Sequence, residues 1–139
     1  MEAQKIKIAI VLLNWNGKTW LEKFLPNLVR CSEQADIFIV DNASEDKSID
    51  YVRSSFPKIN LILNSKNHGY AKGYYDALSK IKADYFVLLN SDVEVTDNWI
   101  NPIIRLMQED ITIAACQPKI LDYNNRNKFE YAGASGGFI

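Results

Sequence analysis

The sequence predicts an α/β fold in which a mostly parallel sheet carries helices on both faces. Short apolar, β-prone runs alternate along the chain with segments whose apolar residues recur at helical spacing. Such alternation is typical of parallel strands joined by right-handed helical crossovers. The first run, at residues 6–13, is apolar throughout, as expected for a strand covered on both faces.

The elements expected from these patterns follow one another in strict alternation. Strands are expected at 6–13, 36–40, 60–64, 85–90 (a buried strand) and 111–121, the last broken near Pro118. Helices are expected at 18–31, from Ser44 onward, at 69–82 and at 97–109. Ser44 and Asp97 are candidate caps for the second and fourth helices, and Glu45 and Asp46 would then lie in the first turn of the second.

Length and composition predict one domain over residues 1–139. The chain is 47% hydrophobic and 24% charged, and its formal net charge of -1 gives no electrostatic case for binding nucleic acid. Two distant cysteines and a single histidine suggest neither a zinc site nor a disulfide framework.

No apolar run is long enough to span a bilayer, so we expect a cytoplasmic protein. The apolar ending, "FEYAGASGGFI", leads us to expect a part of a longer protein.

Polar residues collect where the predicted strands end. Asn14 and Asn16 follow the first strand, Asp41 the second, and Asn90-Ser91-Asp92 the fourth. Because ligands of open α/β sheets bind outside the carboxyl ends of the strands, these residues form a candidate site. Turns also prefer Asn, Asp and Ser for local reasons. Asp41 and Asp92 are harder to explain in that way, because a carboxylate beside a buried strand needs donors or a cation.

Several cofactor classes are excluded by the motifs they require. The segment after the first strand, "NWNGKTW", has one glycine, which is too few for the dinucleotide fingerprint or a P-loop, and the chain has no G-x-S-x-G nucleophile elbow. A nucleotide with a divalent metal fits better. Asp41 could accept hydrogen bonds from a base or ribose, and the oxygens of Asn90 and Asp92 suit Mg²⁺ or Mn²⁺.

Four stretches in order carry a family resemblance: "IAIVLLNWNG", "IVDNASEDKS", "NHGYAKGYYDAL" and "YFVLLNSDVEV". Together they resemble the N-terminal, donor-binding half of the family 2 inverting glycosyltransferases of GT-A fold, particularly the rhamnosyltransferase-like branch. "ACQPKIL" and "GASGGFI" resemble the acceptor-side approach of that family. The resemblance implies transfer of a hexosyl or rhamnosyl group, with inversion, from a UDP- or dTDP-sugar to a glycan or lipid-linked acceptor in polysaccharide or glycan synthesis.

The resemblance also assigns roles to residues. Asn90-Ser91-Asp92 stands where the family keeps its D-x-D-like motif, so Asp92 would bind Mg²⁺ or Mn²⁺. Tyr74 and Tyr75 occupy places where that branch often has Asn. The implied nucleotide-sugar-binding residues are Asn14, Asn16, Asp41, Asn67, Gly69, Lys72 and Asn90.

The catalytic base is not found in this stretch. In the family it is an Asp or Glu of an "ED"-like motif, which we expect beyond residue 139, because Glu109-Asp110 lies at a predicted helix end on the surface. The fragment alone is therefore expected to bind nucleotide weakly and to be inactive.

One alternative is a non-catalytic nucleotide- or sugar-binding module. A flavodoxin-like signalling domain is a further alternative, although the first strand ends without the acidic pair that such domains need. Association with the inner face of a membrane through a further part of the protein is left open, as is the oligomeric state.

Overall fold

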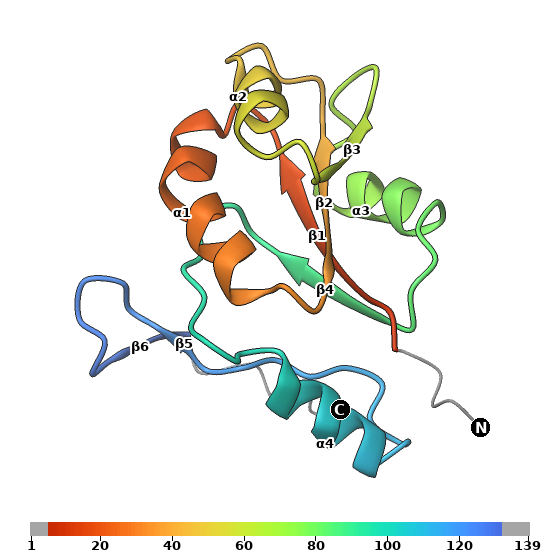
Figure 1. Ribbon diagram of the computed structural model, residues 1–139, viewed down its shortest axis with the longest axis vertical. Coiled ribbons are helices and arrows are strands. Elements are labelled where there is room, and N and C mark those ends of the chain that lie inside the picture. The colour runs from red at the N-terminus through yellow and green to blue at the C-terminus, as the bar shows by residue number, and fades with distance from the viewer. Residues whose placement is uncertain (1–5, 132–139) are drawn as a thin grey trace, which may run out of the picture. The chain divides into compact units, whose positions relative to one another are not determined.

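The computed structural model describes residues 6–131. The chain divides into two compact units, Met1–Asp97 and Asn98–Ile139. The first unit alternates strands and helices, as Figure 1 shows. Its elements are β1 (Ile8–Asn14), α1 (Lys18–Cys31), β2 (Asp36–Asp41), α2 (Ser48–Ser55), β3 (Asn60–Leu63), α3 (Tyr70–Leu78) and β4 (Tyr85–Leu89).

The first unit contains a four-stranded, fully parallel sheet in the order β3-β2-β1-β4. The register places Asn14 beside Asp41, and Leu12 beside Leu89. Backbone hydrogen bonds carry the pairing past the strand ends, from Asn42 N–H to Asn14 O (2.8 Å) and from Asn64 N–H to Asp41 O (2.8 Å). The carboxyl ends of all four strands therefore lie at one edge of the sheet, hereafter the carboxyl edge. The predicted α/β class with a parallel sheet is confirmed.

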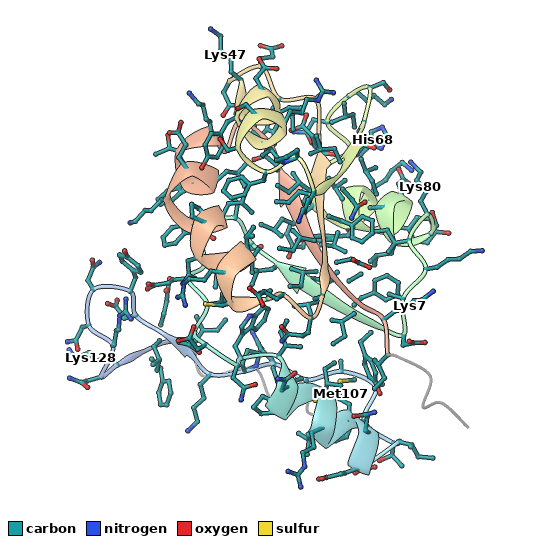
Figure 2. The ribbon with its side chains drawn as sticks, in the orientation of Figure 1. Lys7, Lys47, His68, Lys80, Met107 and Lys128 are labelled. Atoms are coloured by element: carbon teal, nitrogen blue, oxygen red, sulfur yellow. The ribbon has the colours of Figure 1, made fainter. Side chains whose placement is uncertain are left out.

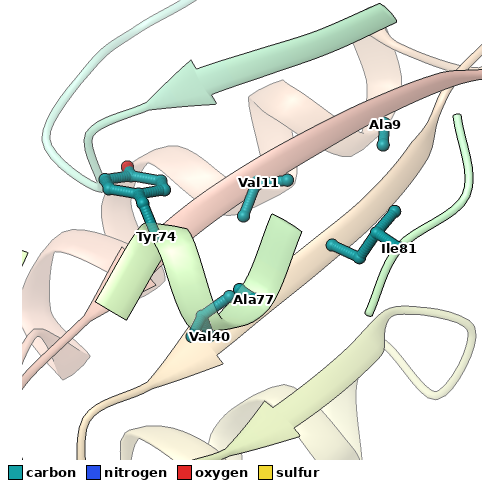
Figure 3. Close-up of a cluster of buried hydrophobic side chains, with 6 residues drawn as sticks. All are labelled: Ala9, Val11, Val40, Tyr74, Ala77 and Ile81. Carbon is teal, nitrogen blue, oxygen red and sulfur yellow. The ribbon is translucent and has the colours of Figure 1, made fainter. Parts of the chain in front are cut away.

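Alternate residues of β1 face opposite layers of helix. Ala9 and Val11 pack with Val40, Tyr74, Ala77 and Ile81 in the cluster that joins the sheet to α3 (Figure 3). The helices α1 and α2 cover the other face (Figure 1). The buried stripe of α1 is spaced as predicted and consists of Leu21, Phe24, Leu25, Leu28 and Cys31. Trp20, the residue before this stripe, is 47% exposed.

β4 is less buried than its apolar sequence indicated. The prediction of a buried strand at 85–90 is wrong in this respect, because Phe86 is 40% and Leu88 is 50% exposed. β4 is an edge strand, paired only with β1 among the described residues, and its two exposed side chains alternate with half-buried ones, so one face of β4 is covered less than the other. Apolar composition predicted the strand correctly and its burial incorrectly.

Two predicted helix caps are wrong. α2 begins at Ser48 after Lys47, not at Ser44, and neither α2 nor α4 has a side-chain cap. The Ser44 hydroxyl instead contacts Asp41, Asn14 and the Asn16 N–H. Asp97 lies before α4 and pairs with Arg30 at 2.8 Å. In both cases the polar group contacts a residue distant in sequence, Asn14 for Ser44 and Arg30 for Asp97, and does not cap a helix.

The second unit contains α4 (Asn101–Glu109) and a two-stranded antiparallel sheet of β5 (Ile120–Leu121) and β6 (Phe129–Tyr131). The strand expected over 111–121 is therefore reduced to its last two residues. The helix expected over 69–82 likewise ends earlier, at Leu78. The stretch "GASGGFI" lies outside the described residues. Within the part of the chain that the structure describes, no helix is both long and apolar enough to cross a membrane.

Candidate functional site

Asn14 is the hub of a buried polar network at the carboxyl edge. Its side chain is 1% exposed, and its Nδ2 donates to Asp41 Oδ1 (2.8 Å), Ser48 Oγ (2.9 Å) and Ser44 Oγ (3.0 Å). Three acceptors share the two hydrogens of one amide, which fixes its orientation. The other amide atom, Oδ1, is buried without a hydrogen-bond partner among the described residues.

Asp41 ends β2 and is 4% exposed. Its Oδ1 accepts hydrogen bonds from Asn14 Nδ2 and Ser44 Oγ, and its Oδ2 accepts one from Ser44 N–H (2.9 Å). These donors compensate the loss of hydration that a buried carboxylate suffers. The carboxylate is thus stabilised from within the protein, and Oδ2 retains room for a further hydrogen bond.

Two hydrogen bonds from backbone N–H groups to side-chain oxygens join the loops after β1 and β2. Asn16 Oδ1 accepts from Glu45 N–H, and Asp46 Oδ2 accepts from Lys18 N–H, each at 2.8 Å. Asp46 Oδ1 also accepts from Ser48 N–H at 3.0 Å. Partial burial of Asp46 opposes its ionisation, but hydrogen bonds from Ser48 and Lys18 outweigh burial and lower the pKa of Asp46. The first two strand ends therefore form one unit.

The turn between β3 and α3 is joined to the same edge through Asn42. Its Nδ2 donates to Gly69 O (3.2 Å), and its Oδ1 accepts from Asn64 Nδ2 (2.8 Å). Asn67 Oδ1 accepts from Gly69 N–H at 2.8 Å. Gly69 has φ 74° and ψ -175°, a conformation that only glycine adopts readily. Asn67 and Gly69 thus shape the backbone that leads into α3.

Lys72 and His68 both contact Asp76 on α3. Lys72 Nζ lies 2.9 Å from Asp76 Oδ1, and His68 Nδ1 lies 2.9 Å from Asp76 Oδ2. Hydrogen bonds from Lys72 and then His68 lower the pKa of Asp76. Lys72 is therefore paired on its own helix, with its side chain 61% exposed.

The turn after β4 carries Asn90, Ser91 and Asp92. Asn90 and Asp92 are exposed, and the Asp92 carboxylate makes no hydrogen bond or ion pair with any residue in 6–131. A methyl group placed on Gly17 would lie 2.5 Å from Asn14 Oδ1 and 3.7 Å from Ser91 Oγ, so this turn adjoins the Asn14 network.

Any cation bound at this turn would be held only in part by protein. No group of three or more His, Cys, Asp or Glu side chains suited to a metal occurs among the described residues. One carboxylate with an amide oxygen matches Mg²⁺ or Mn²⁺ that takes its remaining ligands from phosphate and water. Asp92 and Asn90 are the residues that would hold such an ion.

The structure adds residues that the sequence patterns did not assign to the site. Ser44, Ser48 and Asn42 close the networks around Asp41 and Gly69, and Asp46 joins the loops. Their side chains meet only when the strands align, so neither spacing nor propensity marks them. A polar residue that directly follows a buried strand, as Asn42 does, is the one signal that could have been used.

Comparison with known proteins places the chain in a family. The model of the family described as glycosyl transferase family 2 matches residues 9–134. The chain belongs to glycosyl transferase family 2. Human polypeptide N-acetylgalactosaminyltransferase 16 is 26% identical over 125 residues, which cover 87% of this chain and 21% of the human protein.

Two further relatives of this family 2 chain show how much of a longer protein it matches. The mouse inactive polypeptide N-acetylgalactosaminyltransferase-like protein 5 is 29% identical over 104 residues, covering 71% of this chain and 24% of the relative. The uncharacterized glycosyltransferase YfnE of Bacillus subtilis (strain 168) is 24% identical over 115 residues, covering 80% and 29%. The chain thus spans between a fifth and three tenths of these curated relatives.

Solved structures share the fold of this family 2 chain at low sequence identity. The mannosyltransferase PcManGT of Pyrobaculum calidifontis, in complex with GDP-Man and Mn²⁺, has a TM-score of 0.65 and 16% identity, covering 85% of this chain and 34% of that one. S. aureus TarS 1-349, in complex with UDP-GlcNAc, has a TM-score of 0.65 and 16% identity, covering 87% and 42%. The fold is that of the GT-A glycosyltransferases, as predicted.

Proposed function

We propose that this chain is the donor-binding part of an inverting glycosyltransferase that transfers a sugar from a nucleotide diphosphate to an acceptor hydroxyl. One observation carries the proposal. β1 lies between β2 and β4, so the carboxyl edge sets the buried Asn14 and Asp41 network directly beside the exposed Asn90-Ser91-Asp92 turn. A nucleoside and its diphosphate are two connected groups that need two such neighbouring sites.

The first of these sites would receive the nucleoside. Asp41 would accept a hydrogen bond from base or ribose through Oδ2, which has one donor in the protein. Asn14 and Asn16 would lie beside the nucleoside, Asn14 holding the Asp41 carboxylate and Asn16 holding the loop at Glu45. Buried hydrogen bonds of this kind fix the carboxylate before the ligand arrives, which favours binding.

The second site would receive the diphosphate. The exposed Asp92 carboxylate is negative and would repel a diphosphate if the two met directly. A bound Mg²⁺ or Mn²⁺ would neutralise the charge of the departing diphosphate. Asp92 and Asn90 would hold the ion, and Asn90 would contribute an uncharged oxygen where a second carboxylate would bind more tightly.

The turn before α3 would close the site beside the nucleotide. Asn67 and Gly69 set the backbone there, and Gly69 is also held by Asn42, the residue that follows β2. Lys72 would leave Asp76 to contact a phosphate, because an exposed lysine pair contributes little and is readily exchanged.

The finer assignments follow the family resemblance. We propose transfer of a hexosyl or rhamnosyl group, as in the rhamnosyltransferase-like branch, in polysaccharide or glycan synthesis on a glycan or lipid-linked acceptor. The base that deprotonates the acceptor hydroxyl would lie beyond residue 139, so residues 1–139 alone would bind donor and transfer little. A cytoplasmic protein, associated peripherally with the inner face of a membrane, would suit a lipid-linked acceptor.

A second candidate is a module that binds a nucleotide or sugar without transfer. One relative, the mouse protein 29% identical over 104 residues, is described as inactive. Sugar transfer by a longer chain that carries the candidate base would exclude this reading, and its absence there, with donor binding intact, would favour it.

Calorimetric titration with UDP, dTDP and GDP, with and without Mn²⁺, tests the donor site. We expect a dissociation constant of about 1 mM or lower, and 1 mM corresponds to a binding free energy of about -4 kcal/mol. We expect Mn²⁺ to strengthen this binding. Asp92→Asn should abolish the Mn²⁺ effect, whereas Asp50→Asn, an exposed charge on α2, should not. A folded chain that binds none of the three nucleotides at millimolar concentration would refute the proposal.

A further inference from the structure

The turn that carries Asn90-Ser91-Asp92 is fastened to the protein at both ends. At its start, Tyr74 Oη donates a hydrogen bond to the carbonyl oxygen of Leu89, the last residue of β4, at 3.2 Å. At its end, Val95 N–H donates to Asn27 Oδ1 at 3.1 Å. The two fastening residues lie on α3 and α1, which cover opposite faces of the sheet (Figure 1).

The Tyr74 hydroxyl that donates to this turn is buried and stays protonated. Its side chain is 4% exposed and its ring packs edge-on against Tyr70, with centroids 5.0 Å apart. Burial, with a smaller contribution from Tyr70, raises the pKa of the Tyr74 phenol well above its usual range, so the hydroxyl keeps its proton at every physiological pH. Figure 3 shows the ring reaching from α3 toward the end of β4.

Asn27 belongs to a small network at the end of α1. Its Nδ2 donates to Cys31 Sγ at 3.6 Å, and that thiol contacts Asp97 Oδ1 at 3.1 Å. Arg30 also contacts Asp97 Oδ1, at 2.8 Å. Val95 is itself buried, at 7% exposure, so its backbone is held by packing as well as by Asn27.

We propose that Tyr74 and Asn27 are positioning residues that hold the Asn90-Ser91-Asp92 turn ready for the metal and diphosphate. Asp92 is exposed and has no partner among the described residues, so only the backbone of its turn can orient it. A turn fixed at both ends samples fewer conformations and loses less entropy when Asp92 binds a cation. This inference rests on the proposed donor site.

Two substitutions remove these two hydrogen bonds, and Asn27→Ala also removes the contact of Asn27 with Cys31 Sγ. Tyr74→Phe deletes one hydroxyl and keeps the ring contact with Tyr70. Tyr75→Phe is its matched control, because Tyr75 is adjacent on α3 and 74% exposed. Asn27→Ala removes the Val95 contact from the other face, and alanine favours the helix.

Hydrogen exchange of the backbone amides measures how firmly these two hydrogen bonds hold the turn, and it needs no ligand. In Tyr74→Phe and Asn27→Ala, the amides of residues 90–95 should exchange faster than in the wild type, while those of β1 and β2 remain unchanged. Tyr75→Phe should match the wild type. Unchanged exchange at 90–95 in both variants would overturn the inference.

Titration with UDP measures the consequence. The strengthening of UDP binding by Mn²⁺ should fall about three- to tenfold in each variant, the usual effect of one hydrogen bond, while binding without metal stays the same. A wild-type Mn²⁺ effect that survives in both variants would contradict the positioning role. Absence of any Mn²⁺ effect in the wild type would instead contradict the proposed function.

Discussion

Gly17 lies against the Asn14 side chain with no room for a methyl group. An added Cβ would lie 2.5 Å from Asn14 Oδ1, and Asn14 cannot retreat because its amide is held by Asp41, Ser44 and Ser48. The φ of Gly17 is -103°, so space and not backbone conformation is the constraint. We predict that Gly17→Ala lowers the free energy of unfolding by about 1–3 kcal/mol.

Urea unfolding followed by tryptophan fluorescence measures this change. Thr19→Ala, at an exposed position of α1, is the control and should change the free energy of unfolding by less than about 0.5 kcal/mol. A Gly17→Ala variant as stable as the wild type would show that the Asn14 network is looser than its contacts indicate.

Asp46 should make stability depend on pH. Its pKa is lowered in the folded protein, so its carboxylate stabilises the fold above the unfolded pKa of about 3.9, and this contribution is lost as the pH falls through the lower folded pKa. Asp46→Asn should therefore destabilise the protein at pH 7, and the difference from the wild type should close below about pH 4. Thermal unfolding from pH 7 to pH 3 tests this, with Asp50→Asn as control. A difference that is the same at every pH would contradict it.

At the residue scale, the sequence predicted where the candidate site residues lie but not which residues they contact. Asp41 and Asp92 were both expected to need a donor or a cation. The structure separates them, because Asn14 and Ser44 compensate Asp41 while Asp92 has no partner in 6–131. Those partners come from segments 27 and 3 residues away along the chain. The distant one is set by the alignment of β1 with β2, which periodicity does not specify.

The start of α2 places a lysine in a conformation that suits glycine. Lys47 precedes the helix with φ 63° and ψ 18°, in the left-handed region, and its side chain is exposed (Figure 2). A side chain in this region costs about 1 kcal/mol. We predict that Lys47→Gly raises the free energy of unfolding by about 0.5–1 kcal/mol.

Lys80→Gly is the matched control, because Lys80 is an exposed lysine whose φ is not positive. There the extra freedom of glycine in the unfolded chain should leave stability unchanged or lower it. Chemical denaturation of both variants makes the comparison. Destabilisation by Lys47→Gly would mean that the lysine makes a favourable contact which outweighs the backbone cost.

At the element scale, apolar periodicity predicted the strands of the first unit to within a residue or two, and α1 in full. The residues at which helices begin were harder to predict from sequence, because Ser44 and Asp97 are residue types that favour caps yet bond to Asp41 and Arg30. The strand expected over 111–121 failed for a related reason. Apolar, β-branched residues indicate a strand only where a partner strand is present, and within residues 111–121 only Ile120 and Leu121 pair with another described strand.

At the scale of the whole molecule, the unit Met1–Asp97 holds the four-stranded parallel sheet with α1, α2 and α3. It contains every candidate nucleotide and metal residue from Asn14 to Asp92. We predict that residues 1–97 fold alone, because the elements of this sheet pack within the unit. A cooperative thermal transition and dispersed amide resonances would bear this out. A chain of 97 residues without fixed tertiary structure would show that the second unit is needed for folding.

The fold and the edge that carries the candidate site were predictable because both follow from alternating elements and parallel strands. The division of the chain after Asp97 was not, because no glycine- or proline-rich linker marks it. The sheet order was not predicted either. Adjacency of β1 and β4, on which the pairing of the nucleoside and diphosphate sites depends, arises from strand pairing across more than 70 residues.

The central claim is that one sheet edge binds a nucleotide beside Asn14 and Asp41 and a cation beside Asp92. Amide chemical-shift mapping with UDP, followed by trace Mn²⁺ as a paramagnetic probe, tests both halves on one sample. We predict UDP-induced shifts at residues 14–17, 41–44 and 67–69, and selective line broadening by Mn²⁺ at residues 90–92. Shifts and broadening confined to other parts of the chain, or no change at millimolar UDP, would contradict this account.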